Sequence, residues 1–139
     1  AKPGRGQGYF ADFKNKAMIM VLGYHYRFAD FRTDQDYLQR HFNFLQTSGQ
    51  KKSLELILNG RGDIAVLTKE YLNYHFLTSP EDEARLLISD KFDQVYQHTI
   101  LVRKNHMLTI KYINELLAQM KRKGTLIHLW EKYGLEVKH

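Results

Sequence analysis

The segment between residues 54 and 68 constrains the fold of this chain more than any other. Its first part carries leucine and isoleucine at the spacing of one helix face. Gly60 and Gly62 follow, and glycine readily adopts the left-handed conformation that ends a helix. The next run, 64–67, is continuously apolar, as expected for a strand buried on both faces of a parallel sheet. A helix that leads so directly into a buried strand predicts an α/β fold.

Two further apolar runs, 17–22 and 42–46, are predicted to join the run 64–67 as strands of one mainly parallel sheet flanked by helices. The connections between these runs are long enough for the crossover helices that parallel strands require. Ser48 is placed to cap the helix that follows the second run. The predicted helices span 30–40, 49–59 and 69–77, and two last strands are predicted at 86–88 and 98–103.

The chain changes character from Met107 onward. Apolar residues at positions 110, 113, 116, 117 and 120 form a stripe along one face of a predicted helix. Gly124 can end this helix, and Thr125 can cap a second one. The apolar face of that second helix carries Leu126, Leu129, Trp130 and Tyr133. We interpret both stripes as packing surfaces rather than as a cofactor site.

Parallel strands place their carboxyl ends at one edge of a sheet, where α/β folds bind ligands. The segments after the three predicted strands carry aromatic rings, an imidazole and hydroxyl groups. Helices that start there point N–H groups at the same place. This combination suits a small polar or anionic solute. The predicted ligand-binding residues are Gly23, Tyr24, His25, Tyr26, Ser48, Thr68 and Tyr71.

Composition narrows the classes of function. The chain has 139 residues and no cysteine, which excludes disulfides and thiolate chemistry. Its formal charge is +6, but the one dense basic cluster, 121–123, ends a predicted helix and has no interleaved aromatic residues. We therefore expect no nucleic-acid partner. The histidines are scattered, and no nucleophile or acid/base pair stands out. We expect no metal, no cofactor and no enzymatic activity.

Three segments resemble, in their order and spacing, the extracellular solute-binding protein family 3, the ligand-binding component of ABC importers. The first is Gly-Arg-Gly-Asp-Ile-Ala at 60–65, which is similar to the family's Gly-Arg-hydrophobic-Asp-Ala turn before a strand. The second, 12–23, is similar to the start of the family's second lobe. The third, 99–104 with the helix after it and 123–134, is similar to the family's C-terminal end. The resemblance covers about 10–134.

The resemblance implies a periplasmic protein of the type II binding fold. Such a protein captures a small, amino-acid-like polar solute between two lobes and delivers it to the membrane permease of an ABC importer. Amino-acid-binding members usually carry Ser or Thr after the first strand of the second lobe, and Asp after the strand that follows the Gly-Arg-x-Asp turn. Here Tyr24 and His25 occupy the first place and Thr68 the second. A different polar solute, or none, fits these departures better than an ordinary α-amino acid.

The resemblance also divides the chain. It implies a flexible arm at 1–9, an α/β ligand-binding lobe at 10–97, and a hinge-crossing strand with C-terminal helices of the other lobe at 98–139. Most of the first lobe is then outside this sequence. The apolar faces of the last helices would be covered by this chain or by a second copy, and a homodimer that exchanges these helices is expected. The alternatives are a sensory or effector-binding module of the same fold, and a relic that no longer binds solute.

Overall fold

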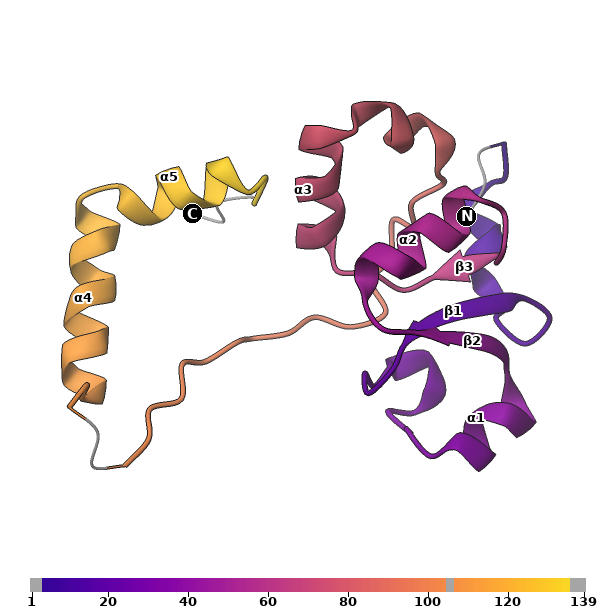
Figure 1. Ribbon diagram of the computed structural model, residues 1–139, viewed down its shortest axis with the longest axis horizontal. Coiled ribbons are helices and arrows are strands. Elements are labelled where there is room, and N and C mark those ends of the chain that lie inside the picture. Colours follow the sequence, from indigo (N-terminus) through magenta and orange to yellow (C-terminus); the bar gives the residue numbers. More distant parts are fainter. Residues whose placement is uncertain (1–3, 105–106, 136–139) are drawn as a thin grey trace. The chain divides into compact units, whose positions relative to one another are not determined.

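The structure, a computed structural model, describes residues 4–104 and 107–135. The chain divides into two compact units, 1–95 and 96–139, and each is described by itself (Figure 1). The first unit contains η1 (Gln7–Ala11), β1 (Ala17–Val21), η2 (Arg27–Ala29), α1 (Gln35–His41), β2 (Asn43–Thr47), α2 (Gln50–Leu58), β3 (Ile64–Ala65), α3 (Lys69–Thr78) and η3 (Pro80–Arg85). The second unit contains α4 (Ile110–Arg122) and α5 (Thr125–Lys132).

Within the described residues the strands form one three-stranded parallel sheet in the order β2-β1-β3. Met18 of β1 pairs with Phe44 on one side and with Ile64 on the other. The predicted α/β class, the three strands and their parallel pairing are confirmed. The fully buried strand is β1, the central one, whereas β3 is a two-residue edge strand that ends before Val66.

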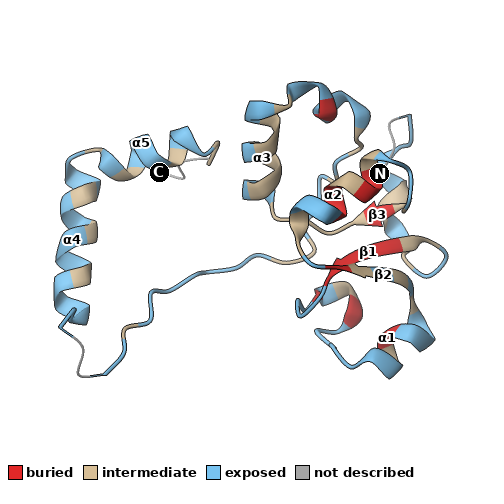
Figure 2. Ribbon diagram, in the orientation of Figure 1, coloured by how far each residue is buried: buried red, intermediate tan, exposed pale blue. Residues whose placement is uncertain are grey.

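The two faces of β1 belong to two separate parts of the core, because successive side chains of a strand point to opposite faces. Met18 and Met20 pack in a cluster that contains Tyr26, Ala29, Leu38 and Ile64, with several phenylalanines around it. Ile19 packs instead against Leu56 and Ile57 of α2. In Figure 2, β1 is the strand with the most buried colour. The sheet is therefore covered by α2 on one side and by the aromatic cluster on the other.

The Gly-Arg-Gly-Asp turn fastens the start of β3 to the start of β1. Asp63 accepts hydrogen bonds from the Ala17 amide at 2.9 Å and from the Tyr9 hydroxyl at 2.9 Å. The amide hydrogen bond is the largest of the influences that lower the pKa of the Asp63 carboxyl, and it leaves a charged acceptor at this junction. A Cβ at Gly62 would lie only 2.5 Å from Cδ1 of Ile19, so the isoleucine occupies the space that a side chain at 62 would need.

Two predicted strands are wrong. Residues 86–88 follow η3 as irregular chain, and the described residues of the predicted strand 98–103 are not in a strand either. Both segments are rich in apolar residues, but neither pairs with another described strand, and a strand exists only where a ladder of hydrogen bonds forms. Leu101 is 92% exposed, so this apolar side chain is not part of a core.

Several predicted helix starts also need correction. The helix predicted over 30–40 begins only at Gln35, because Asp34 caps it by accepting from the Tyr37 amide at 3.1 Å. Ser48 caps nothing: the N-cap of α2 is Gly49, and it makes no side-chain cap. Thr125 is likewise the first residue of α5, after an N-cap at Gly124 with φ 73°. The helices themselves lie close to their predicted positions.

The segment expected to be a flexible arm, 1–9, makes contacts along its described part. Residues 1–3 lie outside the described residues. Arg5 lies 3.8 Å from Asp63, and its guanidinium stacks over the Tyr9 ring. The Gln7 side chain donates to the Ile88 carbonyl at 2.9 Å and accepts from the Asp90 amide at 3.1 Å. This stretch therefore packs within the first unit, against Asp63 and against 88–90.

The second unit consists of two amphipathic helices that contact each other. No residue of α4 or α5 is buried, and neither helix shows the buried colour in Figure 2. Ile110 is 66% exposed and Leu129 38% exposed. No helix in the described part of the chain is long and apolar enough to cross a membrane.

Candidate functional site

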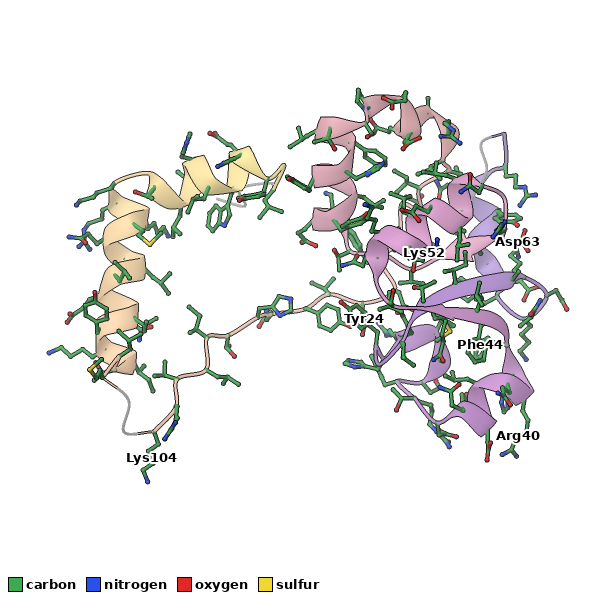
Figure 3. All side chains as sticks on the ribbon, viewed as in Figure 1. Tyr24, Arg40, Phe44, Lys52, Asp63 and Lys104 are labelled. Atoms are coloured by element: carbon green, nitrogen blue, oxygen red, sulfur yellow. The ribbon has the colours of Figure 1, made fainter. Side chains whose placement is uncertain are left out.

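The loops after β1, β2 and β3 are joined at the carboxyl edge of the sheet. The Leu22 amide, directly after β1, donates to the carbonyl of Thr47, the last residue of β2, at 2.9 Å, which places the starts of the first two loops side by side. The Gln50 side chain accepts from the Thr68 amide at 2.8 Å, which links the second and third. The sequence-predicted residues Gly23, Tyr24, Ser48 and Thr68 therefore belong to loops that meet at one edge. Figure 3 shows Tyr24 and Asp63 at opposite ends of the sheet.

Tyr24 and His25 are held on a tight turn and remain exposed. The Tyr24 amide donates to the Val21 carbonyl at 3.2 Å, and Gly23 supplies the φ of 81° that this turn requires. Tyr24 is 46% exposed. The His25 ring lies 5.8 Å from that of Phe31. The rings of Tyr24, His25 and Phe31 thus all follow the carboxyl end of β1.

Phe31 was not predicted as a site residue, and its backbone is unusual. Its φ is 57° and that of Asp30 is 52°, a left-handed conformation that phenylalanine rarely adopts. Hydrogen bonds hold it there, since the Phe31 amide donates to the Tyr26 carbonyl at 2.9 Å. Such strain costs on the order of 1–3 kcal/mol and clusters at functional sites. The sequence gives no signal for it, because residues 30–40 read as a helix.

Tyr26 belongs to the core and not to an open site. It is 2% exposed, and its hydroxyl accepts a hydrogen bond from the Val21 amide at 2.8 Å. The ring packs in the cluster that covers one face of β1. We predicted Tyr26 as a ligand-binding residue, but its ring is part of the core. The helix η2 begins directly after it.

Thr68 and Tyr71 organise the start of α3. The Thr68 hydroxyl oxygen caps the helix by accepting from the Tyr71 amide at 3.2 Å. Tyr71 is half-buried, and burial is the first cause that raises the pKa of its phenol, with the negative charge of Glu55 on α2 second. Tyr71 therefore faces α2, and Thr68 is the member of this pair that stays with the loop edge.

The start of α2 presents polar and cationic groups at the same edge. Ser48 is exposed, and Gly49 begins the helix without a side-chain cap. Lys51 and Lys52 occupy the first turn and are both exposed, and no acid is present in that turn. Cations there oppose the helix dipole, which favours anions at a helix N-terminus. Lys52 lies 3.3 Å from Glu55, so the positive charge of this turn rests on Lys51 and on the N–H groups that begin the helix.

Asp93 and Gln94 fasten the loop after β1 and were not predicted. The Asp93 carboxylate accepts from the amides of Arg27 and Phe28, both at 2.9 Å, and so caps η2. The Gln94 side chain donates to the His25 carbonyl at 2.8 Å. These partners are more than 60 positions apart in sequence, so no local pattern could have found them.

Two hollows are outlined on the first unit, and neither includes Tyr24, His25 or Ser48. A groove of about 960 Å³ runs beside β3 and is lined mainly by apolar side chains, among them Phe10, Phe76 and Leu87. A smaller hollow of about 330 Å³ lies at the opposite end of the sheet, beside Arg5 and Arg61. These three exposed residues thus lie outside both hollows.

The acidic and imidazole groups of the described residues form no metal-binding cluster of three or more. The best-organised pair, His75 and Asp82, lies away from the loop edge: Asp82 accepts from Nε2 of His75 at 2.9 Å and from Arg85 at 2.6 Å. The hydrogen bond with His75 is the first cause that lowers the pKa of Asp82. This cluster joins the end of α3 to η3.

No protein-family model, no curated protein and no solved structure matches the chain. The geometry of the loop edge therefore carries the functional interpretation.

Proposed function

We propose that this chain is a solute-binding component of an ABC-type importer, with a lobe of the type II periplasmic binding fold. Its role is to capture a small polar solute and present it to a membrane permease, without catalysing a reaction and without a metal or cofactor. The observation that carries the proposal is the joining of the three loops at the carboxyl edge of a parallel sheet, where α/β folds bind their ligands. A periplasmic location belongs to the same proposal.

The chemistry of this edge favours a solute with an anionic and a flat or apolar part. Lys51 and the N–H groups at the start of α2 attract negative charge, whereas Lys52 is paired with Glu55 at 3.3 Å. Tyr24 and Phe31 offer exposed ring surface, 46% and 52% exposed respectively. No carboxylate stands at Thr68 to hold an ammonium group. A carboxylate- or phosphate-bearing solute therefore suits the edge better than an ordinary α-amino acid.

The open form of the edge agrees with capture by closure. In the class that the sequence resembles, a solute is trapped between two lobes, and one lobe alone leaves its half of the site exposed. One alternative is a sensory or effector-binding module of the same fold. It would use the same site, but its solute-bound form would act on a signalling partner instead of a membrane permease. The alternative of a relic predicts that no solute binds at all.

A thermal-shift screen of the purified chain against amino acids, short dicarboxylates, phosphate and sulfate tests the proposal. A solute at a hundred times its Kd adds about 2.7 kcal/mol of stability, which raises Tm by roughly 10 °C for a domain of this size. Ser48→Ala and Tyr24→Ala should reduce this shift. Tyr74→Ala is the matched control, because Tyr74 is 45% exposed on α3. The proposal would be contradicted if no solute raised Tm. It would also be contradicted if Tyr24→Ala and Tyr74→Ala reduced the solute-induced rise in Tm equally.

A further inference from the structure

The described residues of the second unit form no buried core. Ile113, Leu117 and Met120 of α4 are half-buried, and no residue of either helix is fully buried. The remaining apolar side chains of the two helices include Ile110 at 66%, Leu116 at 38%, Ile127 at 37% and Leu129 at 38% exposure. Helices shorter than about 12–15 residues are marginal in water without tertiary packing. The apolar faces of α4 and α5 therefore call for a covering surface.

The positive charge of the chain is concentrated in the same unit. The described residues from 96 to 135 contain seven Lys and Arg against two Glu, whereas 1–95 contains thirteen against twelve acids. Almost all of the formal charge of +6 thus comes from the part of the chain that carries the exposed apolar faces. A covering surface must accept apolar side chains and positive charge together.

The cations are arranged around the apolar stripe of α4 as an amphipathic helix requires. Lys111 and Arg122 share one side of α4, since their separation is close to three whole turns, and at about 100° per residue this side lies opposite the apolar stripe. The Lys111 side chain is 86% exposed and lies 4.0 Å from Glu115. The cluster 121–123 stands at the junction with α5, directly before the helix that carries Trp130.

We infer that α4 and α5 form a docking surface for an anionic lipid bilayer. The helices lie in the headgroup region with their apolar faces toward the acyl chains and their cations among the lipid phosphates, as basic amphipathic helices do. Trp130 sits at the depth where tryptophan is enriched in membrane proteins. Charge complementarity selects this occupant, because a second copy would bring the same excess of positive charge to the contact. The inference is independent of the proposed solute site.

The tryptophan provides a direct readout, since the chain contains one, at position 130. The full chain is mixed with vesicles of phosphatidylcholine alone and of phosphatidylcholine with phosphatidylglycerol, and Trp130 emission is followed together with co-sedimentation. We expect a blue shift and co-sedimentation with the anionic vesicles that weaken as salt is added. Equal behaviour with both vesicle types, or no response to either, overturns the inference.

Variants separate the apolar and the electrostatic contributions. Lys121→Gln with Lys123→Gln should lower the partition coefficient roughly thirtyfold, about fivefold for each cation. Ile110→Ser should lower it about tenfold through lost apolar burial. Val95→Ser is the control, because Val95 is 78% exposed outside the helices, and it should leave the partition unchanged.

Two further outcomes count against the bilayer. An equal loss in Val95→Ser and Ile110→Ser would mean that α4 has no special part in binding. A concentration-dependent dimer in which Trp130 is already blue-shifted without lipid, and which Ile110→Ser dissociates, would identify a second copy as the covering surface.

Discussion

Replacing Gly62 by alanine should destabilise the first unit. At an unobstructed position the same change usually stabilises a protein, because alanine restricts the unfolded chain. A Cβ at this position would lie 2.5 Å from Cδ1 and 2.7 Å from Cγ1 of Ile19, well inside the ordinary contact range of 3.4–4 Å. Ile19 is 1% exposed, so it can move only by repacking the core. Overpacking the core lowers the free energy of unfolding by about 1–3 kcal/mol. Alanine also restricts the unfolded chain, which raises the free energy of unfolding by about 0.4–1 kcal/mol. We expect a net loss of about 1–2 kcal/mol in the free energy of unfolding.

Urea unfolding followed by far-ultraviolet circular dichroism measures this loss, and two comparisons assign its cause. Gly8→Ala should change stability by less than about 0.5 kcal/mol, because a Cβ there meets nothing within 4 Å. Ile19→Ala removes both close carbons, Cδ1 and Cγ1, and alone costs about 2–5 kcal/mol. In that background Gly62→Ala should cost about 1 kcal/mol less than in the wild type. A Gly62→Ala protein as stable as the wild type, or an equal cost in both backgrounds, would refute the steric reasoning.

Three other substitutions test contacts within the first unit. Tyr26→Phe should lower the free energy of unfolding by about 1–3 kcal/mol, because it leaves the buried amide of Val21 without its acceptor; an unchanged urea midpoint would exclude this. Asp63 has a lowered pKa in the folded protein, so its stabilisation is present above the unfolded pKa of about 3.9 and is lost as pH falls through the folded value; Asp63→Asn, which lacks this titration, should show a smaller loss of stability below about pH 4 than the wild type. Asp82→Ala should cost about 2–3 kcal/mol, since it removes the buried carboxylate that accepts from both His75 and Arg85, and a neutral result in thermal unfolding would contradict that.

The sequence predicted the sheet because its signal is local and strong. The runs 17–22 and 64–67 are apolar, and 42–46 carries two phenylalanines and a leucine between polar residues. Helix-length connections separate the three segments, which leaves parallel pairing as the simple solution. Strand order was not predictable in this way. β1 is central because Met18 and Ile19 are buried on opposite faces, and a purely apolar run does not tell a central strand from an edge strand.

The two wrong strands show what apolar composition leaves undetermined. Residues 99–102 contain isoleucine, leucine and valine, which favour strands, yet a strand forms only when a neighbour supplies the hydrogen bonds. Propensity at 30–34 failed for a different reason. Asp30 and Phe31 adopt left-handed backbone that no helix-forming pattern anticipates, and the helix starts only after the cap at Asp34.

The candidate site was predicted in part. Topology alone brings Tyr24, Ser48 and Thr68 to one edge, because each follows the carboxyl end of a parallel strand. The sequence did not reveal that Tyr26 is buried, because the order of aromatic residues in a short loop does not show which ring points into the core. The contacts of Asp93 with η2 were missed because they join positions far apart in the chain.

We propose above that the loop edge at Tyr24, Ser48 and Thr68 binds a small polar solute. Amide chemical shifts of the isotope-labelled chain, followed by NMR during titration with the solute that gives the largest thermal shift, test it residue by residue. We expect saturable shifts concentrated at 22–25, 47–52 and 68. Shifts confined to the groove beside β3 or to the turn at Asp63, or no saturable shift with any solute of the panel, would contradict it.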